Sequence, residues 1–380
     1  MEEIYLDHAA TTPMDAEVVK VMTSVFNDVF GNPSSIHSFG RKARKRLDAA
    51  RYTMADSINA DEKEIFFTSG GTEADNLALV GTALANRNKG NHIITTVLEH
   101  HAVLHAAEYL ETLGFEVTYL PADESGRIAP NVLQEALRDD TILVSIMFVN
   151  NETGVIQPIK EIVEVLKDHQ AYFHTDAVQA YGLLDIDVKE LGIDLLTTSA
   201  HKVNGPKGVG FLYAEESVTI QTLHFGGEQE RKRRPGTENV GAIAGFEKAT
   251  QLIMENKAKR NERYLSYKQI FIEQLEAQNV NFALNGDQAT AVSNIVNISF
   301  PGANVEQVLT NLDLAGIAAS SGSACTAGSV DPSHVLSAMF GEAHPCTTNS
   351  VRFSFGSANT KENVMEAANR LAKIIKRLTN

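Results

Sequence analysis

The 380-residue sequence has only two cysteines, Cys325 and Cys346. Two thiols cannot build the disulfide framework of a small secreted domain, so we expect a reducing compartment. The sequence also lacks a run of about 18 apolar residues, and no membrane-spanning helix is predicted. Its first residues, MEEIYLDHAATTP, have neither the basic region nor the apolar core of a secretory signal. We therefore predict a cytoplasmic protein.

Basic residues are also in short supply. The chain has 33 lysines and arginines against 48 aspartates and glutamates, which gives a formal net charge of −15. A protein this acidic is expected to be soluble and is not expected to coat nucleic acid. The composition is 43% hydrophobic and 21% charged, as in ordinary globular proteins, and the length suffices for two or three domains.

Short β-rich runs recur through residues 64–214, and most are separated by enough residues for a crossover helix. Several runs are apolar on both faces, as buried strands of a parallel sheet are. This alternation predicts a doubly wound α/β sheet. The last two runs are too close together for a helix between them, so one of them should be antiparallel. The predicted strands are 64–69, 92–96, 116–120, 141–149, 171–176, 195–200 and 208–214.

The pattern changes after about residue 240. Residues 243–278 are charged and helical in pattern, which predicts a connecting helix that leaves the first domain. Residues 294–300 and 351–356 read as strands, and residues 361–378 place apolar side chains on one helical face. We expect these segments to form a smaller α+β domain.

The segment TSGGTEADN, residues 68–76, follows a predicted strand and opens a helix. Its glycines would let a ligand approach the backbone closely, and the free N–H groups of a helix N-terminus favour an anion. Thr72 adds a hydroxyl donor. The segment lacks the lysine of a nucleoside-triphosphate loop and does not match GxGxxG. A simple strand-to-helix turn is the alternative.

Asp176 stands at the carboxyl end of a predicted strand, where ligands of open α/β sheets bind, and Gln179 follows three residues later. A carboxylate there could keep a heterocyclic nitrogen protonated. The alternative is an aspartate that caps a helix.

Lys202 follows another predicted strand and precedes a Gly-Pro loop. A partly desolvated lysine has a lowered pKa and can attack a carbonyl group. The neighbouring Ser199 and His201 could donate hydrogen bonds to a phosphate, and Lys207 is a competing lysine in the same loop.

Cys325 lies in SSGSACTAGS, where small and polar residues surround one thiol. Nothing in this segment can bury the thiol in an apolar core, so we expect an exposed, mobile loop and a reactive cysteine. Cys346, in AHPCTT, has no such setting, and we expect it to be structural.

Further candidates depend on their context. His100 follows a predicted strand, where a flat imidazole could stack on a ring, and Asn151 follows the long apolar run, where a local turn is the alternative. Arg352 lies inside an apolar strand and needs a carboxylate partner from the protein or from a substrate. The basic run 231–234 is expected to be a solvated loop, from which Thr237 could reach a phosphate.

No metal site is predicted. The twelve histidines are scattered, CxxC is absent, and the spaced histidines at 100, 101 and 105 lack a matching set of cysteines or carboxylates.

These motifs, in this order, resemble the cysteine desulfurases of the NifS/IscS type, which are fold-type-I pyridoxal phosphate (PLP) enzymes close to class V aminotransferases. The resemblance runs from YLDHAATTP at the start to VRFSFG near the end and so covers nearly the whole chain. The matching segments between them include FGNPSS, TSGGTE, EHHAVL, NNETG, HTDAVQ, SAHK, GPKG, GGEQE, RPGTEN and SSGSAC. One departure is Ala327, where the commonest family pattern has serine, and it leaves the sulfur acceptor open.

The resemblance implies a role for each matching residue. Lys202 would link covalently to PLP, and Cys325 would be the nucleophile that accepts sulfur. Asp176 would face the pyridine nitrogen and Gln179 the ring hydroxyl. His100 would stack on the ring and assist proton transfer.

The resemblance also implies ligands for the phosphate of PLP and for the carboxylate of the substrate. Asn151 and Arg352 would bind the substrate carboxylate, with Asn151 also next to the cofactor. The phosphate ligands would be Gly71, Thr72, Ser199, His201 and, across a dimer interface, Thr237.

The same resemblance implies a fold-type-I PLP-dependent transferase that forms a homodimer. A large α/β domain with a mostly parallel seven-stranded sheet would span residues 14–256, and a small α+β domain would combine residues 1–13 and 257–380. The enzyme would convert L-cysteine to L-alanine and leave a persulfide on Cys325. A tRNA 2-thiouridylase or an iron–sulfur scaffold would receive the sulfur. The alternatives are another fold-type-I PLP enzyme, such as a selenocysteine lyase or an aminotransferase, and a non-catalytic sulfur carrier.

Overall fold

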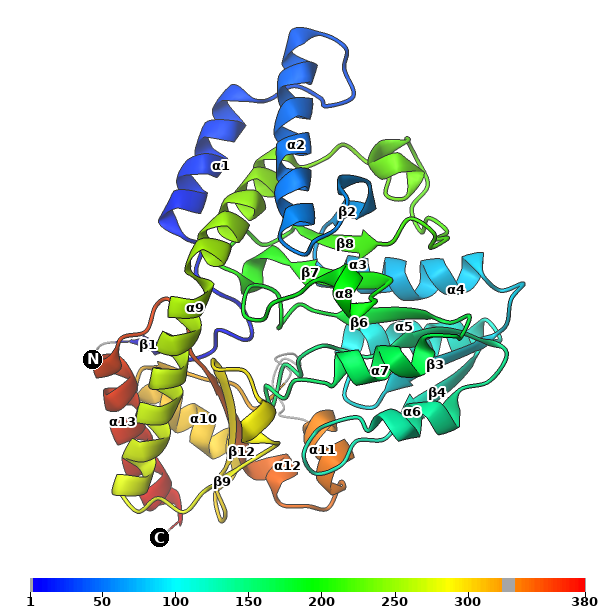
Figure 1. Ribbon diagram of the computed structural model, residues 1–380. Helices are drawn as coiled ribbons and strands as arrows, with labels where there is room; N and C mark the ends of the chain where they lie inside the picture. The colour runs from blue at the N-terminus through cyan, green and yellow to red at the C-terminus, as the bar shows by residue number, and fades with distance from the viewer. Residues whose placement is uncertain (1–2, 323–331, 380) are drawn as a thin grey trace.

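The computed structural model describes residues 3–322 and 332–379. Within these residues, the larger part of the molecule is built on a seven-stranded sheet of order β2-β8-β7-β6-β5-β3-β4 (Figure 1). The strands are β2 (Ile65–Thr68), β3 (His92–Thr96), β4 (Glu116–Leu120), β5 (Thr141–Ser145), β6 (Tyr172–Asp176), β7 (Leu195–Ser199) and β8 (Gly210–Ala214). Strand β8 is antiparallel to both of its neighbours, and the other pairs are parallel. The predicted doubly wound sheet and its one reversed strand are therefore confirmed.

The predicted strand 141–149 was too long. Regular pairing stops at Ser145, and Val149 instead pairs with Ile156 across a turn. The side chain of Asn150 closes this turn, since its Oδ1 accepts hydrogen bonds from the backbone of Glu152 and of Thr153 at 3.0 and 2.9 Å. An Asx-type turn therefore ends the strand inside an apolar run.

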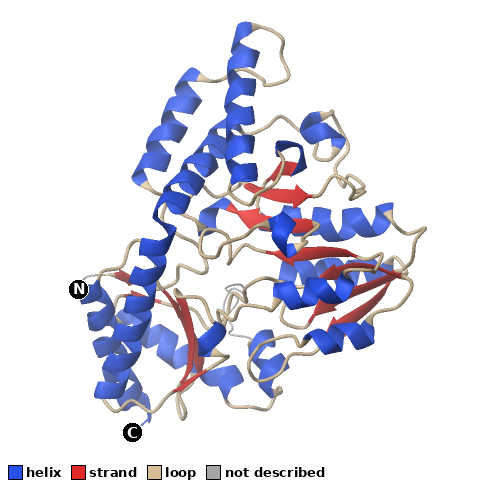
Figure 2. Ribbon diagram, viewed as in Figure 1, coloured by secondary structure: helices blue, strands red, loops and turns tan. Residues whose placement is uncertain are grey.

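Alternating side chains divide the sheet between two apolar layers, as the period of a strand requires. Ile93 and Leu143 face one hydrophobic cluster, which includes α3 and α5, while their neighbours Ile94 and Val144 face the other, which includes α7. Helices thus cover both faces of the sheet (Figure 2). The helices of this part are α1 (Ala16–Asp28), α2 (Ser38–Asp56), α3 (Gly71–Asn76), α4 (Thr82–Ala85), α5 (His101–Thr112), α6 (Pro130–Ala136), α7 (Ile159–Leu166) and α8 (Val188–Leu191).

One long helix, α9 (Val240–Ala277), joins the two parts of the molecule. Its first half packs Phe246 and Ile253 into a cluster under the large sheet, and its second half packs Tyr267 and Phe271 into a separate cluster. The predicted connecting helix is confirmed, with its start three residues earlier than expected. The change of partner along one helix explains why its sequence shows no single apolar stripe.

The second cluster belongs to a smaller α+β part. The antiparallel strands there are β9 (Ala283–Leu284), β10 (Ile295–Ser299) and β12 (Ser350–Ser354), in the order β12-β10-β9. Strand β1 (Ile4–Tyr5) pairs in parallel with β11 (Ile317–Ala318), so the start of the chain lies in this part. The helices are α10 (Val305–Leu314), α11 (His334–Phe340), α12 (Cys346–Asn349) and α13 (Lys361–Thr379).

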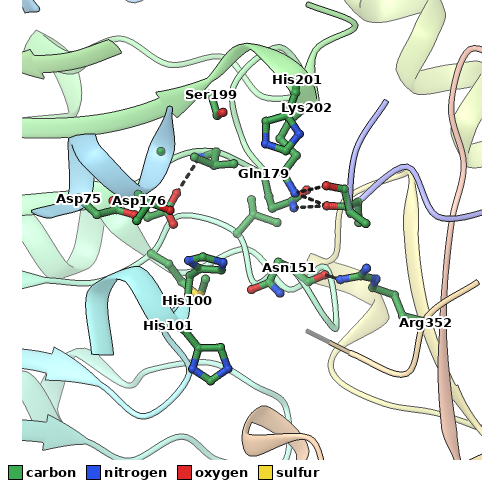
Figure 3. Close-up of a pocket in the computed structure, with 17 residues that line it drawn as sticks. Asp75, His100, His101, Asn151, Asp176, Gln179, Ser199, His201, Lys202 and Arg352 are labelled. Atoms are coloured by element: carbon green, nitrogen blue, oxygen red, sulfur yellow. Dashed lines mark hydrogen bonds between the residues drawn. The ribbon is translucent and has the colours of Figure 1, made fainter. Parts of the chain in front are cut away.

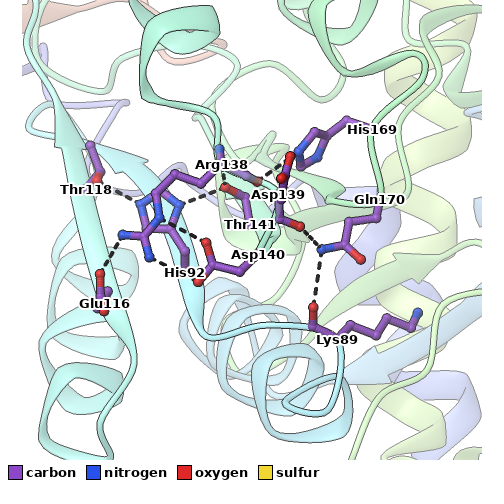
Figure 4. Close-up of polar contacts among 10 residues, drawn as sticks. All are labelled: Lys89, His92, Glu116, Thr118, Arg138, Asp139, Asp140, Thr141, His169 and Gln170. Atoms are coloured by element: carbon purple, nitrogen blue, oxygen red, sulfur yellow. Dashed lines mark hydrogen bonds and ion pairs between the residues drawn. The ribbon is translucent and has the colours of Figure 1, made fainter.

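A buried histidine ties together the amino ends of three strands of the large sheet (Figure 4). His92 is 0% exposed, with Nδ1 2.7 Å from the Thr141 hydroxyl and Nε2 2.8 Å from the Thr118 hydroxyl. Burial, followed by the charge of Arg138, lowers the pKa of His92. This contact fixes β3 between β4 and β5 at the edge opposite the cavity described below.

None of the helices in the described part of the chain is both long enough and apolar enough to span a lipid bilayer.

Candidate active site

A cavity of about 390 Å³ lies at the carboxyl ends of the central strands, bordered also by residues 9 and 10 and by β12 (Figure 3). This volume is in the range of pockets that bind small molecules. Ten of the twelve predicted site residues line it, and they come from both parts of the molecule. They are Gly71, Thr72, His100, Asn151, Asp176, Gln179, Ser199, His201, Lys202 and Arg352.

Lys202 projects into this cavity from the turn after β7. Its Nζ donates to the carbonyl oxygens of Ala9 and Ala10, the latter at 2.9 Å. Burial, followed by the charge of Arg352, lowers the pKa of Lys202 to about 8. The neutral amine, which is the form that attacks a carbonyl, is therefore more abundant than in a solvated lysine. The competing Lys207 is exposed and does not line this cavity.

Asp176 ends β6 and is 6% exposed. Its Oδ1 accepts a hydrogen bond from the backbone N–H of Val178 at 2.8 Å, while the side chain also lines the cavity. Burial raises the pKa of Asp176 to about 6. Within the ranges that the structure describes, the one group of three possible metal ligands is Asp75, His100 and Asp176. That group lies in this same cavity, so a metal there would compete with any ligand of the cavity.

His100 occupies the N-cap of α5, where its Nδ1 accepts a hydrogen bond from the backbone N–H of Ala102 at 3.1 Å. Burial, followed by the charge of Lys202, lowers the pKa of His100 to about 4, so the ring is neutral at pH 7. Because Nδ1 is an acceptor, the ring proton lies on Nε2. His101 packs instead against His105 and His334, with ring centroids 5.1 and 4.8 Å away.

One end of the cavity is formed by the turn between β2 and α3. Gly70 has φ +150°, a conformation that side chains disfavour, and a Cβ on Gly71 would lie 3.0 Å from Val178. Helix α3 continues through a π-helical turn (Leu77–Gly81) into α4, so its first N–H groups open one long helix. Thr72, Ser199 and His201 stand around this end, and all three also line the adjoining surface hollow. Such an arrangement suits a phosphate.

Arg352 and Asn151 form the opposite side. The Arg352 guanidinium is 2% exposed and donates to Asp7 Oδ1 and to the backbone oxygen of Asn151, both at 2.9 Å. The predicted carboxylate partner of Arg352 is therefore Asp7, within the protein. Asn151 Oδ1 and Arg352 Nε are buried and have no hydrogen-bond partner among the described residues. A polar ligand could therefore donate a hydrogen bond to Asn151 Oδ1 and accept one from Arg352 Nε.

Two predicted site residues are not part of this cavity. Cys325 lies outside the described residues. Thr237 is exposed and does not line the cavity of its own chain. The basic run before it is not simply solvated, as we expected, because the Arg234 guanidinium binds the carboxylate of Glu73 on α3 at 2.7 Å. This ion pair holds the loop of Thr237 against the helix whose N-terminus opens the cavity.

Cys346 is 3% exposed, and its sulfur lies 2.9 Å from Nδ1 of His344. Burial raises the pKa of Cys346 to about 11, which leaves almost no thiolate at pH 7. These observations agree with the structural role expected for it.

Sequence reasoning missed several residues that line the cavity. Ala9 and Ala10 contribute backbone carbonyl oxygens, which no side-chain type can signal. Asp75 lies four residues after Gly71 and therefore on the same face of the helix, a spacing that could have identified it. Val178 packs beside Gly71 and gives the cavity an apolar wall.

The residues present fit PLP. A desolvated lysine is available for its carbonyl carbon, a carboxylate for its ring nitrogen, and an open helix N-terminus for its phosphate. The apolar side chain of Val178 and the neutral ring of His100 could cover a flat ring, and the buried Asn151 Oδ1, which has no hydrogen-bond partner among the described residues, could accept a hydrogen bond from a polar ligand. Lys202, Asp176, Thr72 and Ser199 would then hold the cofactor.

Comparisons with known proteins agree with this geometry. The model of the family named aminotransferase class-V matches residues 4–366. The chain is 59% identical over 379 residues to the putative cysteine desulfurase IscS 1 of Bacillus subtilis (strain 168), with 100% of both chains covered. It is also similar to the solved structure of a NifS-like protein, with a TM-score of 0.92, 32% identity, and 99% and 100% of the two chains covered. A structure of SspA in complex with cysteine gives a TM-score of 0.83 at 36% identity, with coverages of 93% and 98%. The chain therefore belongs to the aminotransferase class-V family, whose enzymes depend on PLP.

Proposed function

We propose that this protein is a cysteine desulfurase, which removes the sulfur of L-cysteine and releases L-alanine. The observation that carries the proposal is that Lys202, Asp176 and Arg352 line the same cavity. The 59% identity to a putative cysteine desulfurase supports it. The complex of SspA with cysteine supports the choice of substrate.

The proposed reaction breaks the Cβ–S bond of cysteine and forms an S–S bond on the enzyme. The Cys325 thiolate attacks the substrate sulfur, and the electron pair of the Cβ–S bond stays with the substrate carbon. That carbon takes up a proton and becomes the methyl group of alanine, while Cys325 keeps the sulfur as a persulfide. Atoms and electrons balance without any external oxidant. The role of Cys325 is assigned from the sequence motif.

When bound, PLP supplies an electron-withdrawing ring that stabilises negative charge on the Cα of an attached amino acid. Lys202, as a neutral amine, would take the Cα proton of the substrate. Asp176, as an anion, would keep the ring nitrogen protonated. Arg352 would hold the substrate carboxylate, with the amide of Asn151 beside it. Because its proton lies on Nε2, His100 would begin the reaction as a neutral hydrogen-bond donor beside the ring.

The test is turnover of L-cysteine by the purified protein, with alanine and sulfide both measured in the presence of a thiol reductant. Cys325→Ser should keep the visible absorbance of bound cofactor but release no sulfide. Cys346→Ser is the matched control and should retain wild-type turnover, because that thiol is buried away from the cavity. Normal turnover by Cys325→Ser would show that the persulfide forms elsewhere.

Product analysis also separates the two other readings. An aminotransferase would give a keto acid in place of alanine, and a selenocysteine lyase would act on selenocysteine in preference to cysteine. A non-catalytic sulfur carrier would be colourless and would not respond to added PLP.

We further propose that the persulfide sulfur passes to a protein acceptor, for tRNA thiolation or for iron–sulfur cluster assembly. The IscS name of the 59% identical relative is the support for such a transfer. Cysteine labelled with radioactive sulfur, supplied with a tRNA 2-thiouridylase and tRNA or with an iron–sulfur scaffold, identifies the acceptor by where the label appears. Label that stays on Cys325 in both reactions would overturn this part of the proposal.

We also propose that the working form is a homodimer. Helices α1 and α2 and the turn between them expose a group of large apolar side chains that a lone molecule would leave in water. They are Val19, Phe26, Phe30, Ile36, Phe39 and Tyr52. Thr237, exposed on its own chain, would then reach the phosphate of the partner's cofactor.

A further inference from the structure

The cavity holds a second carboxyl group that the proposed reaction does not use. Asp75, on α3, is 1% exposed and lines the cavity beside Asp176 (Figure 3). One oxygen of each carboxyl group and one nitrogen of His100 all lie within 4.8 Å of one another. Two carboxyl groups buried this close together cannot both ionise readily, so the pair should hold one proton.

The hydrogen bonds of the two groups decide which one holds that proton. Asp176 Oδ1 accepts the backbone N–H of Val178 at 2.8 Å, a contact that stabilises the charged form. Asp75 Oδ1 is buried and has no hydrogen-bond partner among the residues that the structure describes. Lys202 also favours the charged form of Asp176. Asp176 is therefore the better anion, and Asp75 is the better acid.

The histidine closest to Asp75 does not supply a compensating charge. Nε2 of His174 lies 3.7 Å from Asp75 Oδ1 and 3.1 Å from the Thr197 hydroxyl, and its Nδ1 is 2.8 Å from the Ser145 hydroxyl. The ring is 0% exposed, and burial lowers the pKa of His174 to about 3. The neutral ring of His174, on β6, therefore links both neighbouring strands, β5 and β7.

The other titratable groups that face Asp75 do not compensate it either. Glu99, before α5, supplies no positive charge: burial raises the pKa of Glu99 to about 8, and its Oε1 already accepts the backbone N–H of Met147 and the Thr96 hydroxyl, each at 2.9 Å. His100 is neutral at pH 7. Burial, followed by the charge of Asp176, raises the pKa of Asp75, and the Thr197 side chain opposes this shift without reversing it.

We propose that Asp75 is a positioning residue that stays protonated in the folded protein, so that Asp176 alone presents a negative charge to the ring nitrogen of PLP. One anion matches the one positive charge of a protonated pyridine nitrogen. A second anion would have no positive charge to offset it even when the cofactor is bound. The inference rests on the proposed function only for the identity of the cofactor.

Asp75→Asn tests this directly, because the amide has the shape of the protonated acid and cannot ionise. The full-length holoenzyme of this variant should bind PLP within about threefold of the wild-type affinity at pH 7. It should lose one carbonyl band of a protonated carboxylic acid from the infrared spectrum. Asp194→Asn is the matched control: it removes a partly buried acid that directly precedes β7, outside the cavity, and should leave that band in place.

The pH dependence of stability gives a second readout. An acid whose pKa is raised by folding makes the folded state lose stability as the pH rises above its unfolded value of about 3.9. The thermal midpoint of the wild type should therefore fall more steeply than that of Asp75→Asn between about pH 5 and pH 9. The difference should be larger without PLP than with it.

Either of two results would overturn the inference. One is a protonated-acid infrared absorption of unchanged intensity in Asp75→Asn, since Glu99 would keep its own band in both proteins, and the other is an identical pH slope for the two proteins without cofactor. Neither readout depends on desulfurase activity, so failure of the proposed function would be recognised separately, by the absence of alanine.

Discussion

Burial pushes several side chains of the site toward their neutral forms. The pKa of Lys202 falls to about 8, that of His100 falls to about 4, and that of Asp176 rises to about 6. The common cause is desolvation, which penalises a charge whatever its sign. The result is a cavity in which the pKa values of Lys202 and Asp176 lie close to neutral pH, as acid–base chemistry requires, while His100 is uncharged.

The first prediction at this scale concerns Lys202. Lys202→Ala removes the amine that would bind the cofactor carbonyl and take the substrate proton, so kcat should fall by at least about 1,000-fold. The visible absorbance of bound cofactor should change as well. Lys207→Ala is the control and should behave like the wild type, because that lysine is exposed outside the cavity. A Lys202→Ala enzyme with normal absorbance and turnover would contradict the assignment.

The second prediction concerns Arg352. Arg352→Lys keeps a positive charge but loses the planar fork that binds Asp7 and the backbone of Asn151. The KM for cysteine should rise by about 10- to 100-fold, while the absorbance of bound PLP stays unchanged. Steady-state kinetics and spectra on the same preparation check both parts. A control at Arg370, which pairs with Glu366 on α13, should leave the KM as it is.

Site residues were predictable from the sequence where a polar side chain stands at the end of an apolar strand. Asp176, Ser199 and Lys202 are of this kind, and parallel strand ends meet at one edge. Ala9 and Ala10 act through carbonyl oxygens and could not be predicted, because every residue has one. Asp75 was overlooked because it lies inside a helix, where an acid is usually solvated.

At the scale of elements, the type of each long strand and helix followed from its apolar period, whereas its ends depended on local contacts. Strand β5 stops early because the Asn150 side chain forms a turn, and no periodicity shows that. Helix α8 has only four residues and ends at Gly192 in the left-handed conformation, too short for a helical period to be visible.

The buried histidine of β3 provides the prediction for this scale. His92→Leu leaves the hydroxyls of Thr118 and Thr141 without their buried partner and should lower the free energy of unfolding by about 1–3 kcal/mol. Urea denaturation measures it, and His169→Leu, at the half-buried end of the same cluster, is the control.

The lowered pKa of His92 adds a dependence on pH. Its contribution to stability is complete above the unfolded pKa of about 6.5 and is lost as the pH falls below it toward the folded value. His92→Leu should remove this acid-sensitive part of the denaturation profile. Equal acid sensitivity in the variant and the wild type would assign that loss to other groups.

At the scale of the whole molecule, we propose that residues 14–256 form one domain and that residues 1–13 and 257–380 form the other. The hydrophobic clusters support this division along α9, which changes from one to the other between Met254 and Tyr264. Helix α11 is an exception, because Val335, Leu336 and Met339 pack into the cluster of the large sheet. The sequence indicated the change through its shift from short strands to a long helix. The surface that we propose for contact with a second copy could not be predicted from the sequence, because apolar residues on an exposed helical hairpin have the same pattern as core residues.

The proposed homodimer leads to the last prediction. Phe30 is 72% and Ile36 is 92% exposed, so a charge at either position should weaken self-association without disturbing the fold. Phe30→Asp should shift sedimentation at micromolar concentration from dimer toward monomer, and PLP binding should weaken with it if Thr237 serves the partner. Leu314→Asp, also exposed but on α10, is the control. A wild-type protein that sediments as a monomer would contradict the proposal.

The first residues of the chain pair with residues of its C-terminal part. Ile4 pairs with Ile317, and Asp7 binds Arg352. During synthesis on a ribosome, residues 4–10 therefore leave the exit tunnel long before those partners exist, although the last strand of the large sheet is complete at Ala214. The carbonyl oxygens of Ala9 and Ala10 accept hydrogen bonds from the Lys202 amine. These two residues can reach their final places only after β12 has been made. The active site can thus be completed only late in synthesis, and a ribosome that stalls before β12 leaves the large sheet without a finished active site.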